Sequence, residues 1–124
     1  MKVLALDYGS ARTGVAVSDP TGTVARPVGV VTKVNEPKGF GELIALLHDE
    51  APELVVVGLP LTLRGEHGNQ ARETAAFVER LRAAVGTRVE MWDERFTSVL
   101  AAGDDARAAA HLLSSYLEWL TPAS

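Results

Sequence analysis

The first third of the chain alternates short apolar runs with polar turns. Residues 2–7, 14–19 and 24–32 are apolar runs rich in Val, Leu or Ala, and the links between them contain Gly9 and Gly22. Short glycine-containing links between such runs are typical of hairpins. We therefore expect these three segments to form an antiparallel meander of strands.

The remaining two thirds alternate helical and extended patterns. Residues 38–49 carry leucines at helical spacing before Pro52, and residues 54–58 form the continuous apolar run of a strand covered on both faces. A second helix that stops at Gly86, a fifth strand over 88–92 and a last helix over 105–120 complete the pattern. The apolar stripe of the second helix comprises Ala71, Thr74, Ala75, Val78, Leu81 and Val85.

The predicted order of elements is β-β-β-α-β-α-β-α. The second half contains two strand–helix–strand units, which cross over right-handed and place their strands parallel. A chain of 124 residues suggests one domain. We therefore expect an α/β domain over residues 1–124, with a five-stranded mixed sheet and helices on its faces.

Three acidic positions fall where this topology brings strand ends together. Asp7 ends the first strand, Glu94 follows the fifth, and Asp105 begins the last helix in phase with its apolar stripe. Ligands of open α/β sheets gather at this carboxyl edge. If the fourth strand lies between the first and the fifth, those two strands are about 9–10 Å apart. The three carboxylates are therefore candidate catalytic residues and metal ligands. Asp19 belongs at the opposite edge and is excluded.

Carboxylate oxygens suit Mg²⁺ or Mn²⁺, and a cation held there can promote attack of water on a phosphodiester. Each residue also has an ordinary alternative role. Asp7 can be a turn former, Asp104 or Asp105 can cap the last helix, and Glu94 can form an exposed ion pair with Arg95.

The loop over residues 61–68 leaves the same edge and leads into the second helix. Its polar and basic side chains can grip a phosphate backbone, or can simply be solvated. Two further arginines, one near Asp7 and one beside Glu94, can hold phosphate or orient the carboxylates. The candidate substrate-binding residues from these regions are Arg12, Arg64, Asn69, Gln70, Arg72 and Arg95.

Other candidates carry weaker signals. His67 in the same loop can act as a general acid or base, although a lone loop histidine is more often incidental. His48 and His111 lie in predicted helices and are assigned no role. Trp92 and Trp119 can stack on bases, but we expect both to be packing residues.

Composition narrows the classes of protein. The chain has no Cys, which excludes disulfides, zinc-thiolate sites and cysteine nucleophiles. No stretch approaches the ~20 apolar residues of a membrane span, and the opening apolar run is shorter than a secretory signal. The net charge of −4 is unusual for a nucleic-acid protein, but a carboxylate site neutralised by cations accounts for part of it, and 12 Lys and Arg remain for phosphates.

Several motifs resemble those of the YqgF family of pre-16S ribosomal RNA nucleases, which are related to Holliday junction resolvases. The motifs are Leu4-Ala5-Leu6-Asp7-Tyr8-Gly9, Arg12-Thr13-Gly14-Val15-Ala16-Val17-Ser18-Asp19-Pro20, Val56-Val57-Gly58-Leu59-Pro60, Gly68-Asn69-Gln70-Ala71 and Trp92-Asp93-Glu94-Arg95-Phe96-Thr97. The last helix is also similar, with Asp105, Ala108-Ala109 and Ser115-Tyr116-Leu117. The resemblance covers nearly the whole chain.

This resemblance implies a ribonuclease H-like fold and a divalent-metal-dependent nuclease, cytoplasmic, that trims precursor 16S ribosomal RNA during ribosome biogenesis. It implies the same acidic trio of Asp7, Glu94 and Asp105, and it adds Thr97 to the residues expected at the substrate. The chain departs from the family in having only residues 98–104 where relatives have a longer basic stretch, either because of a true deletion or because a mobile loop is missing from this sequence. A smaller departure is Thr62, where Asn is usual.

Other functions stay open. A resolvase of branched DNA and a non-catalytic nucleic-acid or ribosome-binding module both suit this fold. Sugar kinase and actin-like ATPases share a related core, but they bind nucleotide between two such domains and this chain supplies one. The expected partner is precursor or structured RNA, or branched DNA, with no membrane, and the expected state is a monomer or weak homodimer.

Overall fold

The elements follow one another in the predicted order. A computed structural model of the chain describes residues 1–59, 68–93 and 105–120. The strands are β1 (Val3–Asp7), β2 (Arg12–Ser18), β3 (Ala25–Thr32), β4 (Leu54–Leu59) and β5 (Arg88–Asp93). The helices are α1 (Pro37–Glu50), α2 (Asn69–Ala84) and α3 (Asp105–Leu120).

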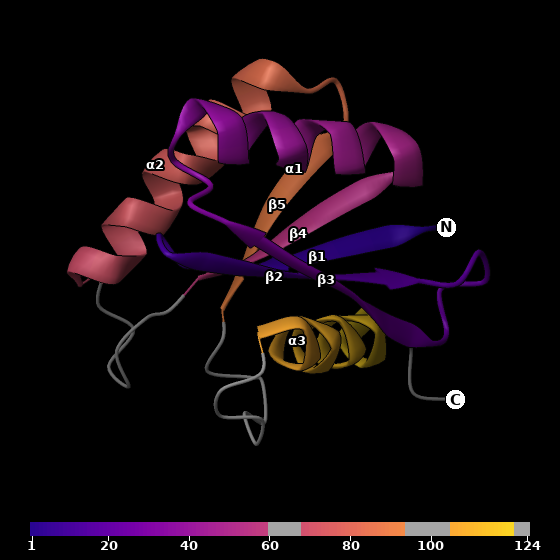
Figure 1. Cartoon of the computed structure of the whole chain (residues 1–124). Coiled ribbons are helices and arrows are strands. Elements are labelled where there is room, and N and C mark those ends of the chain that lie inside the picture. The colour runs from indigo at the N-terminus through magenta and orange to yellow at the C-terminus, as the bar shows by residue number, and fades with distance from the viewer. Residues whose placement is uncertain (60–67, 94–104, 121–124) are drawn as a thin grey trace.

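The five strands form one mixed sheet in the order β3-β2-β1-β4-β5. The β1–β2 and β2–β3 pairs are antiparallel, and the β1–β4 and β4–β5 pairs are parallel. Helices α1 and α2 cover one face, and α3 covers the other (Figure 1). The predicted meander, the mixed sheet and the position of β4 between β1 and β5 are confirmed.

Alternation along β1 divides the core into two layers. Leu4 and Leu6 are fully buried in the layer beneath α1 and α2, whereas Val3 and Ala5 are fully buried in the layer beneath α3. Successive side chains of a strand point to opposite faces. The next two positions, Asp7 and Tyr8, therefore follow the α3 face and the α1/α2 face respectively.

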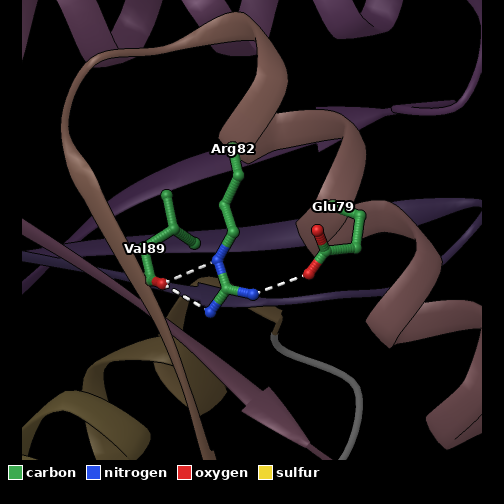
Figure 2. A network of polar contacts seen from close by, with 3 residues as sticks. All are labelled: Glu79, Arg82 and Val89. Carbon is green, nitrogen blue, oxygen red and sulfur yellow. Dashed lines mark hydrogen bonds and ion pairs between the residues drawn. The ribbon is translucent and has the colours of Figure 1, made fainter.

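The C-terminal end of helix α2 is hydrogen-bonded to β5. Arg82 donates from Nε and Nη2 to the Val89 carbonyl oxygen at 3.0 and 2.8 Å, and its Nη1 pairs with Glu79 at 2.6 Å (Figure 2). Two N–H groups of the guanidinium converge on this one carbonyl oxygen, which orients the Arg82 side chain toward the β5 backbone. The last turn of α2 is thereby held against β5.

The two tryptophans differ in burial. Trp92 is buried and its ring lies edge-on to Tyr116, with centroids 5.8 Å apart, which confirms its predicted packing role. Trp119 is 67% exposed, so the prediction that it packs is wrong. Its ring lies beside that of Tyr116, with centroids 5.9 Å apart, at the rim of a hollow that Leu54 and Arg88 also line.

No helix within residues 1–59, 68–93 and 105–120 has both the length and the apolar character needed to cross a membrane.

Candidate active site

Asp7 occupies the carboxyl end of β1 at a partly exposed position. It lies opposite Gly14 of β2, while its predecessor Leu6 lies beside Val57 of β4, which in turn pairs with Met91 of β5. The ends of β1, β4 and β5 therefore share one edge of the sheet, as predicted. By alternation the Asp7 side chain belongs to the face that α3 covers.

The turn after Asp7 is tightly constrained. A Cβ atom added at Gly9 would lie 2.3 Å from the Arg12 carbonyl oxygen, so no other residue fits this turn without moving backbone. The fully buried Thr13 hydroxyl donates to the Gly9 carbonyl oxygen at 3.0 Å and accepts from the Gly9 N–H at 3.3 Å. These bonds fix the main chain immediately after the Asp7 carboxylate.

For the other two predicted acidic residues, the structure describes only the neighbouring residues or the main chain. Strand β5 ends at the half-buried Asp93, one residue before Glu94 in the sequence, and Glu94 lies outside the described residues. Asp105 is the first residue of α3, but its side chain is not among those described.

Helix α3 runs from the carboxyl edge toward the opposite edge. Tyr116 near its end bonds Glu90 at the start of β5, and Trp119 lines a hollow with Met1, Leu54 and Arg88 at that opposite edge. The start of α3 therefore points toward the edge that holds Asp7.

The carboxylates at this edge suit a hard divalent cation. Asp7 precedes a turn held by the Thr13 bonds, which favours a fixed oxygen ligand. Asp93 belongs by alternation to the α1/α2 face, because its neighbour Trp92 packs beneath α3. Among residues 1–59, 68–93 and 105–120, no three side chains of His, Asp or Glu gather closely enough to hold a metal. The full trio of Asp7, Glu94 and Asp105 thus stays a prediction.

The predicted substrate-binding residues fall into two groups. Arg12 begins β2 opposite Thr32, at the same edge as Asp7, and its side chain is exposed. Asn69, Gln70 and Arg72 are exposed in the first turns of α2. The remaining candidates lie outside the described residues; they are Arg64, His67, Arg95 and Thr97.

A polar cluster beside Asp7 was not predicted. The Tyr8 hydroxyl donates to Glu73 Oε1 at 2.7 Å and accepts from Asn35 Nδ2 at 2.6 Å, and Arg80 Nη1 donates to Asn35 Oδ1 at 2.9 Å. The Tyr8 ring stacks on Phe77, with centroids 4.7 Å apart. The sequence did carry one signal for it, because Tyr8 continues the alternation of Leu4 and Leu6 and so belongs to the same face of the sheet.

Burial raises the pKa of the Tyr8 phenol, and the negative Glu73 carboxylate adds to this effect, while the bond from Asn35 opposes it. The phenol therefore stays protonated and can donate its hydrogen bond throughout the neutral range.

Asp19 lies at the opposite edge, as predicted. Its carboxylate accepts from the Thr21 hydroxyl and from the backbone N–H groups of Thr23 and Val24. The bond from Thr21, followed by the two backbone bonds, lowers the pKa of Asp19 to about 2. This carboxylate organises the β2–β3 turn and takes no part in the candidate site.

Relatives of known sequence match over most of the chain. A protein of Rubrobacter xylanophilus is 44% identical over 131 aligned positions, which cover 94% of this chain and 92% of the relative. A protein of Sulfurihydrogenibium is 38% identical, with 97% and 92% covered. One of Chloroflexus aurantiacus is 41% identical over 99 residues, which cover 80% of this chain and 65% of the relative. All three carry the name "Putative pre-16S rRNA nuclease".

The alignment with the Rubrobacter protein is longer than the 124 residues of this chain. That relative therefore contains internal residues that this chain lacks.

Solved structures share the fold at low sequence identity. The RuvC structure of Thermus thermophilus has a TM-score of 0.58 at 18% identity, covering 96% of this chain and 95% of that one. The Fowlpox virus resolvase, solved with Holliday junction DNA, has a TM-score of 0.63 at 13% identity, covering 98% and 100%. These likenesses establish the ribonuclease H-like fold that the motifs implied.

The sequence profile of one family, described as RuvX, Holliday junction resolvase, matches residues 1–119. This match spans both the strand that carries Asp7 and the helix that begins at Asp105. Together with the relatives, it confirms the resemblance drawn from the motifs: the chain belongs to the RuvX family of Holliday junction resolvases.

Proposed function

We propose that this protein is a divalent-metal-dependent nuclease that hydrolyses phosphodiester bonds in precursor 16S ribosomal RNA. The observation that carries the proposal is the position of Asp7. Asp7 is the last residue of β1 and precedes a turn held by hydrogen bonds. It lies at the sheet edge where β5 also ends, and the start of α3 points toward this edge. The names of the relatives support the RNA substrate, and a role in ribosome biogenesis implies a cytoplasmic protein.

In this proposal Asp7, Glu94 and Asp105 hold Mg²⁺ or Mn²⁺. Such a cation, when bound, supplies Lewis-acid stabilisation of the charge that develops on phosphate oxygens and lowers the pKa of water. The carboxylate of Asp7 provides an anionic ligand, and the bonds between Gly9 and Thr13 hold the main chain that follows it.

Exposed side chains around the edge supply the grip on substrate in this proposal. Arg12 and Arg72 offer positive charge to phosphates, and Asn69 and Gln70 offer amide donors from the first turn of α2. Arg64, Arg95 and Thr97 complete the set from the sequence motifs. Because Glu73 of α2 accepts a hydrogen bond from Tyr8, the donors at the start of α2 are connected to the strand that carries Asp7.

The test is cleavage of a radiolabelled precursor 16S RNA fragment in Mn²⁺ or in EDTA. We expect cleavage only with metal, and a loss of more than about a hundredfold in Asp7→Asn, because the substitution removes an anionic ligand while keeping the side-chain shape. Asp49→Asn is the matched control. Asp49 is exposed on α1, so this variant should cleave the RNA as the wild-type protein does. Cleavage that persists in EDTA, or in Asp7→Asn, contradicts the proposal.

The second candidate is a resolvase of branched DNA. The description of the family favours it, and structural neighbours were solved with Holliday junctions. A four-way DNA junction assayed beside the RNA separates the two, because the preferred substrate is the one with the larger kcat/KM. Metal-dependent binding of either substrate without cleavage would instead favour a non-catalytic binding module.

A further inference from the structure

A continuous network of polar side chains joins three separate segments next to Asp7. It starts at the Tyr8 hydroxyl, which bonds both Glu73 of α2 and Asn35 of the β3–α1 connection. Asn35 in turn accepts a hydrogen bond from Arg80, one further α2 side chain. The network thus connects the end of β1, the approach to α1 and two turns of α2.

Packing fixes the aromatic part of this network, whereas the side chains of Asn35, Glu73 and Arg80 are exposed. Tyr8 is 7% exposed, and its ring stacks on Phe77, which is 1% exposed. The Arg80 guanidinium lies over the Phe40 ring of α1 at 4.8 Å from the centroid. Aromatic stacking and cation–π contact each add to the hydrogen bonds, so the hydroxyl of Tyr8 has one well-defined place.

Tyr8 shares its main chain with Asp7 but points to the other face of the sheet. Fixing the Tyr8 side chain therefore fixes the backbone that carries the Asp7 carboxylate, and the Thr13 bonds at Gly9 fix it from the following residue. On α2, Glu73 is adjacent to Arg72, which is exposed and a candidate for phosphate contact. One hydroxyl thus links the candidate ligand to the candidate substrate-binding helix.

We propose that Tyr8 is a positioning residue that, through Glu73 and Asn35, sets the place of the Asp7 carboxylate relative to α2. This inference rests on the proposed function, because it assigns Tyr8 to the same site. A tyrosine that only filled the core would need its ring, which Phe supplies equally well. The positioning role needs the hydroxyl, and this difference makes the two roles separable.

The decisive variant is Tyr8→Phe, which keeps the ring on Phe77 and removes only the hydroxyl. We expect the Mn²⁺ concentration for half-maximal cleavage to rise about tenfold, because groups that orient a metal ligand typically cost 10–100-fold when removed. We expect Glu73→Gln, whose amide oxygen still accepts from Tyr8, to stay within about twofold of wild type. Glu73→Ala should resemble Tyr8→Phe.

Tyr116→Phe is the matched control. Tyr116 is also buried, also packs against an aromatic ring, here edge-on, and also bonds a glutamate, but it lies on α3 near the opposite edge. It should lose some stability, less than Tyr8→Phe because only one hydrogen bond is removed, and should keep the wild-type Mn²⁺ dependence. If both tyrosine variants leave the Mn²⁺ midpoint unchanged, or shift it equally, the positioning role is wrong.

A readout without substrate keeps this test separate from the proposed function. Hydrogen exchange at the Tyr8 and Gly9 amides, measured by NMR in metal-free buffer, should accelerate about tenfold or more in Tyr8→Phe and stay unchanged in Tyr116→Phe. A wild-type protein that cleaves nothing would refute the nuclease, while faster exchange would still support Tyr8 as the anchor of Asp7. Unchanged exchange in Tyr8→Phe would overturn the inference in either case.

Discussion

Tyr8 and Tyr116 form closely similar contacts on opposite faces of one sheet. Each ring is buried against a second aromatic ring, Phe77 for Tyr8 and Trp92 for Tyr116, and each hydroxyl bonds a glutamate. The difference is what each bond connects. Tyr116 joins α3 to a neighbouring strand, whereas Tyr8 joins β1 to α2 and to the segment before α1. Equal local chemistry therefore serves packing in one region and alignment of the candidate site in the other.

The largest expected effect concerns the ring beneath Tyr8. Phe77 is among the largest fully buried side chains, and Phe77→Ala should destabilise the fold by about 3–5 kcal/mol, because it removes apolar contacts and leaves a cavity. Phe77→Leu, which keeps most of the volume, should cost less than about 1.5 kcal/mol. Urea denaturation followed by circular dichroism measures both, and equal losses in the two variants would exclude a tightly packed ring.

Two glycines of α1 test how closely the Tyr8 side of the molecule is packed. A Cβ at Gly39 would lie 2.1 Å from the Lys33 carbonyl oxygen, so Gly39→Ala should cost about 1–3 kcal/mol through forced backbone movement. Gly41 has open space around its Cβ position, and Gly41→Ala should stabilise by up to about 1 kcal/mol. Opposite signs in thermal unfolding are expected, and a neutral Gly39→Ala would contradict the close approach.

The two hydroxyls should also differ in stability. Tyr116→Phe removes one hydrogen bond, worth about 1 kcal/mol, from a partly buried site. Tyr8→Phe leaves both Glu73 and Asn35 without that partner, so its cost should be larger by roughly 0.5–1 kcal/mol. Chemical denaturation at pH 7 measures the free energy of unfolding of both variants. A larger loss in Tyr116→Phe than in Tyr8→Phe would contradict this expectation.

The smallest effect appears only at alkaline pH. Burial, followed by the charge and hydrogen bond of Glu90, raises the pKa of Tyr116 to about 12. A raised pKa means that the fold favours the neutral phenol. The resulting stabilisation is complete below pH 10, the ordinary tyrosine value, and is lost as the pH rises toward 12. Because the chain has two tyrosines, absorbance at 295 nm in Tyr8→Phe follows Tyr116 alone. A midpoint near pH 10 in folded protein would contradict the burial of its hydroxyl.

Much of the frame was predictable from local pattern. Apolar runs joined by short glycine-containing links, and helical spacing in α1 and α2, are properties of neighbouring residues, so the order of elements and the edge that holds Asp7 followed from them. The same topology pointed to Glu94 and Asp105, and the resemblance to a known family pointed to them again; their side chains lie outside the described residues.

The Tyr8 network could not be predicted in the same way. Its partners Asn35 and Glu73 lie 27 and 65 residues away from Tyr8 in the chain, and no periodicity connects positions so far apart. Phe77 falls between positions of the predicted stripe on α2, so its burial was missed. Trp119 was predicted to be a packing residue, but it stays 67% exposed on the last turn of α3.

The central claim is that the edge at Asp7 binds a divalent cation and that the Tyr8 side of the sheet sets its affinity. Equilibrium titration with Mn²⁺, with the free ion measured by electron paramagnetic resonance, tests this directly in wild type and in Asp7→Asn, Tyr8→Phe and Tyr116→Phe. The account predicts saturable binding in wild type and in Tyr116→Phe, binding about tenfold weaker in Tyr8→Phe, and none at this site in Asp7→Asn. Equal binding by wild type and Asp7→Asn would contradict it.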